Sequence, residues 1–145
     1  MLDDRIYMRS QGYRAPMSLT VKILIVNAAI YVLEEIGLAI IKGPGPWTEW
    51  FALSRDGLIS WRVWQLLTFQ FMHGGLLHLF FNSWAIYVFG KAVEEAIGPR
   101  EFLKLYLCSG VFGGLLQIGF GLLLESEGEV LIIGASAGAF GLVAA

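Results

Sequence analysis

Apolar residues gather in four long blocks along this chain, separated by short polar segments. Three of the blocks, residues 19–41, 74–92 and 102–124, are each about as long as the 20 or so residues that a helix needs to cross the hydrocarbon core of a bilayer. The fourth begins near residue 131 and reaches residue 145, so we expect it to be a helix that is cut off there. The pattern predicts an all-α, multi-pass bundle of transmembrane helices.

The polar segments between the blocks differ in character. Residues 1–18 form a polar arm, residues 94–104 a charged turn and residues 125–129 an acidic loop. Residues 42–63 combine helix-breaking glycine and proline with tryptophan and charged residues. Because the indole ring suits the boundary between lipid and water, we expect this last segment to lie on or partly in the membrane. Glu34 and Glu35 interrupt the end of the first block, and we place them towards its far interface.

The composition supports a membrane protein. Apolar residues make up 57% and charged residues 15% of the 145 residues, whereas a soluble domain is nearer 45–50% apolar and about 25% charged. The net charge of −2 gives no basic footprint for nucleic acid. A single cysteine, Cys108, excludes an internal disulfide framework. The first 18 residues do not resemble a cleavable signal peptide.

Lysine and arginine are distributed unevenly between the two sides of the predicted bundle. One side carries Arg5, Arg9, Arg14, Lys22, Lys91, Arg100 and Lys104, and the other carries Lys42, Arg55 and Arg62. Because cytoplasmic loops are rich in these residues, the N-terminus is predicted to be cytoplasmic. Residues 42–63 and 125–129 then face outwards.

Three polar residues in the blocks are predicted to lie at the same depth. His78 and Asn82 are four residues apart, so they share one face of the second helix near its outer start. Ser136 follows the outward acidic loop, at the outer start of the fourth block. A hydroxyl nucleophile near groups that stabilise an oxyanion is the requirement of a hydrolytic site, and a helix start adds free backbone N–H groups.

These residues occur within an ordered set of short motifs. The motifs are residues 64–68 (WQLLT), 71–73 (FMH), 78–82 (HLFFN), 90–94 (GKAVE) and 134–141 (GASAGAFG). In this order, across roughly residues 20 to 145, they resemble the rhomboid intramembrane serine proteases. The resemblance implies a six-helix core that cleaves transmembrane protein substrates within the lipid of a bacterial-type plasma membrane. Residues 19–145 would be the first four helices of that core.

The resemblance also implies a role for each site residue. Ser136 would be the nucleophile, and His78, Asn82 and the Ser136 backbone N–H would hold the oxyanion. Phe140 would pack beside the catalytic histidine, and Glu94 would be a structural hydrogen-bonding residue at the inner helix turn. We expect no cofactor and no metal.

The chain departs from the family pattern in three places. Ala137 follows Ser136 where the family has glycine, and Trp64-Gln65 stands where the family usually has Trp-Arg. The family's general base is a histidine two helices after the serine, whereas this chain has only His73 and His78. We therefore expect the base to lie beyond residue 145 and the chain alone to be inert.

Other interpretations of Ser136 stay open. Gly134 and Gly138 could form a helix-packing motif around it, or residues 134–138 could be the Gly-x-Ser-x-Gly elbow of a soluble hydrolase. A non-catalytic relative that binds transmembrane clients would also explain Ala137. A transporter is less well supported, because the spans show no ladder of ionisable groups.

The two histidines could also be metal ligands, although their spacing of five puts them on different faces of a helix and no acidic or thiol ligand joins them. We expect His73 instead to fix the loop or the helix start by hydrogen bonding.

Overall fold

The computed structural model describes residues 17–42, 45–123 and 131–145. Within these ranges every regular element is a helix, and the remaining β-type feature is one isolated bridge. The predicted all-α class is therefore confirmed. Nearly all of the polar arm at residues 1–18, and the acidic loop at residues 125–129, lie outside the described residues.

Three helical segments are long and apolar enough to cross a membrane. The first is α1 (Leu19–Ile41), with the bounds that hydropathy predicts. The second, Leu76–Ile97, is made of α5 (Leu76–Ala85), the π-helical turn η3 (Ile86–Gly90) and α6 (Lys91–Ile97). The third is α7 (Pro99–Leu123).

The connection between the second and third membrane-spanning segments is shorter than the sequence suggests. The second continues past residue 92, and Gly98 alone separates it from Pro99. Gly98 has φ 84°, a left-handed conformation that glycine adopts readily at the end of a helix. Proline is favoured at the first helical position, because its missing N–H would have no partner there. One residue thus replaces the predicted turn.

The prediction of a helix from residue 131 is wrong in its start. Helix α8 (Ser136–Val143) begins five residues later, and Ile132 before it pairs with Leu53, which lies between α2 and α3. Leu53 N donates to Ile132 O over 3.0 Å, and Ile132 N donates to Leu53 O over 2.8 Å. Gly134 then has φ 122°, which no helix accommodates. These contacts, rather than local hydropathy, decide where α8 starts.

The tryptophan-rich segment that begins at residue 45 forms short helices rather than an irregular loop. It contains α2 (Pro46–Phe51) and α3 (Arg55–Ile59), followed by α4 (Gln65–Thr68) and the 3₁₀ turn η2 (Phe69–Phe71). The fully buried Gln65 amide donates to Glu49 O over 2.8 Å and accepts from Ser54 N over 3.3 Å. The Trp64 indole donates to Trp50 O, and the two indole rings stack. These hydrogen bonds and the stacked indole rings hold the short helices in a fixed position beside the bundle.

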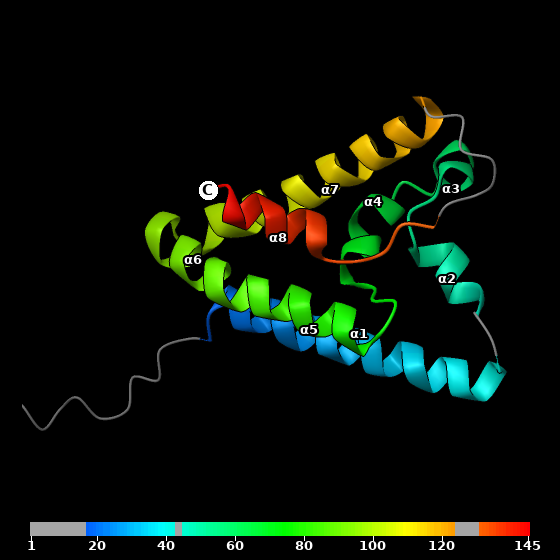
Figure 1. Ribbon diagram of the computed structural model, residues 1–145, viewed down its shortest axis with the longest axis horizontal. Coiled ribbons are helices and arrows are strands. Elements are labelled where there is room, and N and C mark those ends of the chain that lie inside the picture. The colour runs from blue at the N-terminus through cyan, green and yellow to red at the C-terminus, as the bar shows by residue number, and fades with distance from the viewer. Residues whose placement is uncertain (1–16, 43–44, 124–130) are drawn as a thin grey trace, which may run out of the picture.

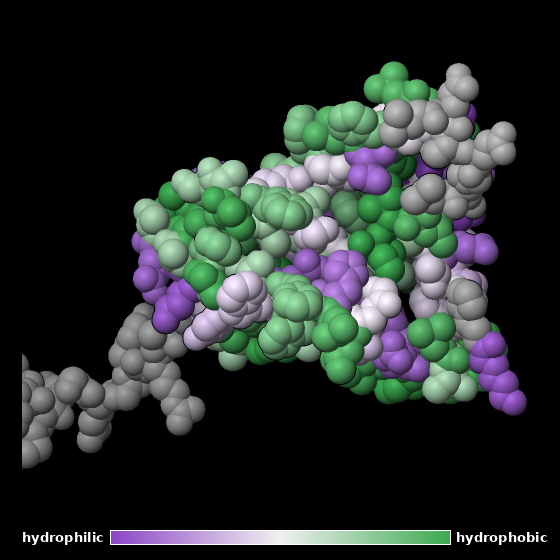
Figure 2. All heavy atoms as spheres, viewed as in Figure 1, coloured by the Kyte–Doolittle hydropathy of each residue, from purple (hydrophilic) through white to green (hydrophobic). Residues whose placement is uncertain are grey.

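The helices form a bundle in which α8 lies between α5 and α7 (Figure 1). Helix α1 runs beside α5 on the other side. The core contains Ile86, Phe102, Tyr106 and Leu142, all almost fully buried. The outer surface is largely apolar (Figure 2), as expected for helices that contact lipid.

Glu94 fastens the start of α1 to α6. Its carboxylate accepts hydrogen bonds from Leu19 N over 2.7 Å, Thr20 N over 2.9 Å and the Thr20 hydroxyl over 2.7 Å. The first N–H groups of a helix have no partner within it, and a carboxylate there also interacts favourably with the helix dipole. The predicted structural role of Glu94 is confirmed.

Candidate active site

Ser136 is the first residue of α8 and is half-buried. The segment that leads to it is held from two sides. Besides the pairing of Ile132 with Leu53, Gly134 N donates to Phe69 O over 2.9 Å. The position of the serine therefore depends on Leu53 and on Phe69 of η2 as well as on its own helix.

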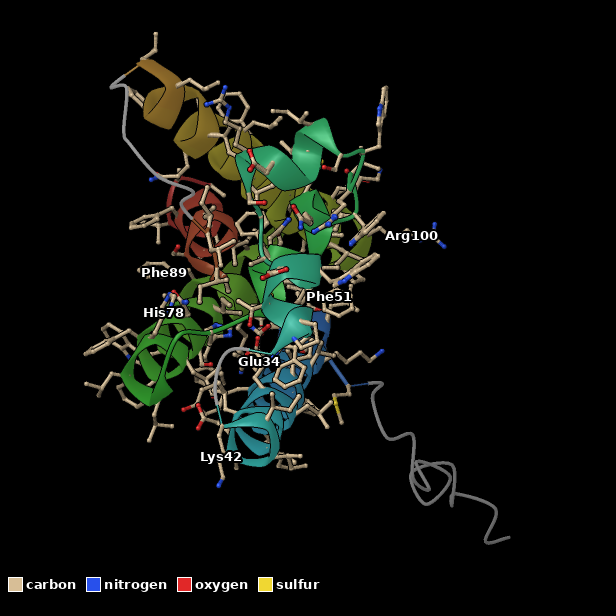
Figure 3. The ribbon with its side chains drawn as sticks, turned by 90° about the vertical axis from the view of Figure 1, so that its right-hand side faces the viewer. Glu34, Lys42, Phe51, His78, Phe89 and Arg100 are labelled. Atoms are coloured by element: carbon tan, nitrogen blue, oxygen red, sulfur yellow. The ribbon has the colours of Figure 1, made fainter. Side chains whose placement is uncertain are left out.

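The turn at Gly134 lies directly against His78 and Asn82 of α5. A Cβ atom built on Gly134 would stand 2.6 Å from His78 Cε1 and Nε2 and 3.6 Å from Asn82 Nδ2. The missing side chain lets the backbone before Ser136 come within contact distance of both groups. His78 and Asn82 lie on one face of α5, as the spacing predicts, and Figure 3 shows His78 beside the red ribbon of α8.

Asn82 retains an unused hydrogen-bond donor. Its side chain is 7% exposed, and Nδ2 has no hydrogen-bond partner among the described residues. A buried polar group without a partner is unfavourable by about 1–3 kcal/mol, so its presence calls for an explanation. Ser136 and His78 likewise share no hydrogen bond with each other or with Asn82 in the described part of the chain. Figure 2 shows a hydrophilic patch between α5 and α8, the two helices that carry Asn82 and Ser136.

His73 and His78 are closer to each other than the sequence argument allowed. They do not lie on different faces of one helix, because His73 precedes α5 and the chain turns at Gly74 and Gly75. Their rings meet edge to face with centroids 5.4 Å apart. The described residues contain no group of three potential metal ligands that includes them. The sequence held no signal for this ring contact.

His73 is fixed by hydrogen bonds, as expected from the sequence. Its backbone N donates to Glu34 Oε2 over 3.2 Å, and its Nδ1 lies 3.2 Å from Phe71 O. Burial and, to a lesser extent, the neighbouring His78 together lower the pKa of His73 to about 4, against a smaller opposing effect of Phe71 O. His73 is therefore neutral near pH 7 and supports the ring of His78 without adding charge.

Small residues allow α8 to pack closely on α7. A Cβ on Gly113 would stand 2.6 Å from Ala137 Cβ, and one on Gly138 would stand 2.7 Å from the Tyr106 ring. Gly138 is thus a packing residue, but Gly134 lies outside α8 and contacts His78 instead. Gly134 and Gly138 therefore do not form the helix-packing motif that their spacing suggested.

Phe140 lies one turn after Ser136 and is 72% exposed. The histidine beside which it is expected to pack is absent from this sequence, so that expectation stays a prediction.

The chain matches the family description "Rhomboid domain" over residues 60–145. Among individual proteins, it is 34% identical to the putative rhomboid protease YdcA of Bacillus subtilis, over 59% of this chain and 41% of that protein. It is 33% identical to the rhomboid protease GlpG of Yersinia enterocolitica, over 74% of this chain and 35% of that protein. A third relative, 32% identical over 47% of this chain and 21% of its own length, is the inactive RHOMBOID-like protein 8 of Arabidopsis thaliana. The chain thus spans about two fifths or less of the length of these relatives.

Proposed function

The chain belongs to the rhomboid family, and from that membership we propose that the full-length protein is an intramembrane serine endopeptidase. Membership of this family implies membrane-protein substrates in general, and the substrates proposed here are transmembrane segments. Residues 19–145 would be the first four helices of a six-helix core in a bacterial-type plasma membrane. Residues 1–18 would form the cytoplasmic arm.

In the proposed reaction, Ser136 Oγ attacks the peptide carbonyl of a substrate segment that has unwound near the outer membrane face. A histidine beyond residue 145 accepts the hydroxyl proton and later delivers it to the leaving amine. Asn82, His78 and the Ser136 backbone N–H donate to the oxygen that becomes negative. Water then hydrolyses the acyl-enzyme, which releases the second product and restores the serine.

The observation that carries this proposal is the approach of Gly134 to His78 and Asn82, two residues before Ser136. It supports a site in which a nucleophile at a helix start faces preorganised donors. The unengaged Asn82 Nδ2 is consistent with an oxyanion donor that finds its partner only when substrate reacts.

The alternative is a non-catalytic protein that binds transmembrane clients. Ala137 in place of the family's glycine favours it, and one of the relatives is itself named inactive. The two functions predict the same fold and differ in the reactivity of Ser136.

Cleavage of a reporter transmembrane substrate by the full-length protein tests the proposal. Ser136→Ala should abolish cleavage, and Asn82→Ala should reduce turnover about 100- to 1000-fold while leaving residual activity, because one oxyanion donor is lost. Ser83→Ala, one residue along α5 from Asn82, is the matched control and should cleave normally.

A serine-directed fluorophosphonate probe provides a second readout. Label on the wild type that disappears in Ser136→Ala supports the protease, whereas folded wild type without label supports the client-binding alternative. Cleavage that survives Ser136→Ala contradicts the mechanism.

A further inference from the structure

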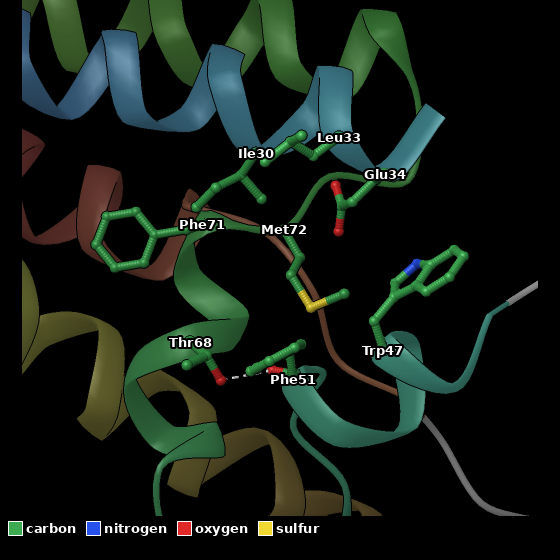
Figure 4. A pocket seen from close by; sticks show the side chains of 8 residues that line it. All are labelled: Ile30, Leu33, Glu34, Trp47, Phe51, Thr68, Phe71 and Met72. Carbon is green, nitrogen blue, oxygen red and sulfur yellow. Dashed lines mark hydrogen bonds between the residues drawn. The ribbon is translucent and has the colours of Figure 1, made fainter. Parts of the chain in front are cut away.

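A cavity of about 440 Å³ lies between α1 and the short helices α2, α4 and η2 (Figure 4). Its walls are the apolar side chains of Ile30 and Leu33 from α1, Trp47 and Phe51 from α2, and Phe71 and Met72. Its volume falls in the roughly 300–1,000 Å³ range of small-molecule sites. The cavity is separate from the proposed active site, since neither Ser136 nor His78 nor Asn82 lines it.

One carboxylate interrupts this apolar lining. Glu34 extends from α1 into the cavity, between Trp47 and Met72 (Figure 4). Its Oε2 accepts a hydrogen bond from His73 N, but no lysine, arginine or histidine of the described residues pairs with it. The other polar lining residue, Thr68, donates its hydroxyl to Phe51 O over 2.7 Å and so is already engaged. A charged carboxylate in apolar surroundings is unfavourable unless it binds a proton or a cation compensates it, so a cationic group that enters the cavity would stabilise Glu34 in its charged form.

One wall of the cavity belongs to a candidate membrane span, since Ile30, Leu33 and Glu34 lie within Leu19–Ile41. At its rim, Leu33 of the candidate membrane span α1 is 67% exposed, and Phe51 of α2 is 46% exposed. An occupant that enters from this direction comes from the bilayer. Apolar walls and a single anionic group together suit an amphiphile with an apolar chain and a compact cationic head.

We propose that this cavity binds a phospholipid with a primary ammonium headgroup, of the phosphatidylethanolamine class. The ammonium group donates to the free oxygen of Glu34, and an acyl chain lies along Ile30, Phe71 and Met72. A primary ammonium can both neutralise and hydrogen-bond to the carboxylate, whereas the quaternary ammonium of phosphatidylcholine has no N–H to donate. The anionic headgroup of phosphatidylglycerol would be repelled.

Native mass spectrometry of the full-length protein in detergent tests this proposal. Phosphatidylethanolamine, phosphatidylcholine and phosphatidylglycerol with identical acyl chains are added in turn, and bound lipid is counted. We expect the wild type to prefer phosphatidylethanolamine over phosphatidylcholine by about five- to tenfold, the effect of one hydrogen bond that only the primary ammonium can donate. Glu34→Gln should remove that preference.

Two further variants keep the result interpretable. Glu35→Gln removes the neighbouring carboxylate, which does not line the cavity, and should keep the preference. Ile30→Trp fills the cavity with Glu34 intact and should lower binding of all three lipids, so it tests the site even if Glu34→Gln fails to fold.

Equal binding of phosphatidylethanolamine and phosphatidylcholine by the wild type would overturn the proposal. So would an unchanged preference in Glu34→Gln, or an equal loss in Glu35→Gln. Binding of a lysine-bearing transmembrane peptide that phosphatidylethanolamine fails to displace would assign the cavity to protein clients instead. None of these outcomes depends on whether Ser136 is reactive.

Discussion

At the scale of single residues, Gly134 has the most demanding environment near the proposed site. Its φ of 122° disfavours any side chain, and a Cβ there would collide with the His78 ring. The sequence shows that a glycine begins the motif at residues 134–141, but it does not show that this glycine faces His78. Only the fold, which brings residues 78 and 134 together, reveals the reason.

Gly134→Ala should reduce cleavage by the full-length protein about 100-fold, because displacement of a catalytic group by about 1 Å has an effect of that size. The strained backbone should also lower the free energy of unfolding by about 1–3 kcal/mol. Gly119→Ala is the control, since a Cβ on Gly119 meets nothing within 4 Å. Turnover of a reporter substrate and denaturant unfolding measure the two effects. Full activity in Gly134→Ala would show that His78 has room to move without consequence.

His73 makes stability depend on pH. Its pKa in the folded protein, about 4, lies below the usual 6.5 because the ring is 5% exposed and faces His78. The unfolded chain therefore binds the proton more tightly, and the stabilisation is present above pH 6.5 and decreases as the pH falls from about 6.5 towards 4.

The free energy of unfolding should fall by up to about 3 kcal/mol across that range. His73→Gln should give a shallower dependence, because the titrating ring is removed. Unfolding of the full-length protein at several pH values measures both. An identical pH dependence in wild type and variant would mean that His73 does not titrate in this range.

At the scale of elements, the contact between α7 and α8 rests on pairs of small residues. Gly113 faces Ala137, the residue that departs from the family pattern. The two positions therefore share a fixed amount of space, and the extra methyl of Ala137 is accommodated by the missing side chain of Gly113.

Gly113→Ala should destabilise the full-length protein by about 1–3 kcal/mol, because the two methyl groups overlap. Ala137→Gly in the same chain should recover most of that loss. A double-mutant cycle of unfolding free energies measures the coupling. Additive effects of the two substitutions would contradict the direct contact.

Hydropathy predicted the long helices but not the short ones or the start of α8. The long spans could be located because their length and apolarity are properties of the local sequence, and α1 has the predicted bounds. The late start of α8 and the short helices at residues 46–71 could not, because long-range contacts such as Leu53 with Ile132 determine them. For the site, the spacing of His78 and Asn82 predicted their shared face, whereas the contact of His73 with His78 depends on the turn before α5.

At the scale of the whole molecule, the proposed orientation can be measured. In a full-length Cys108→Ala background, Asp56→Cys on α3 should react with a membrane-impermeant maleimide added outside the cell. Glu95→Cys on α6 should react only after the membrane is opened, because the excess of lysine and arginine predicts that this end is cytoplasmic. Both residues are exposed, so access to the membrane side decides the result. The opposite labelling pattern would mean that the orientation is inverted.

The bridge between Leu53 and Ile132 has a consequence for biogenesis. Two membrane spans lie between its partners, so its closure joins residues far apart in the chain. Until the second and third spans have been inserted into the bilayer, Leu53 cannot pair with Ile132, and Gly134 cannot contact His78 and Asn82 of α5. Ser136 can therefore reach its position only late in synthesis. Formation of the site requires that the two preceding spans have first been inserted.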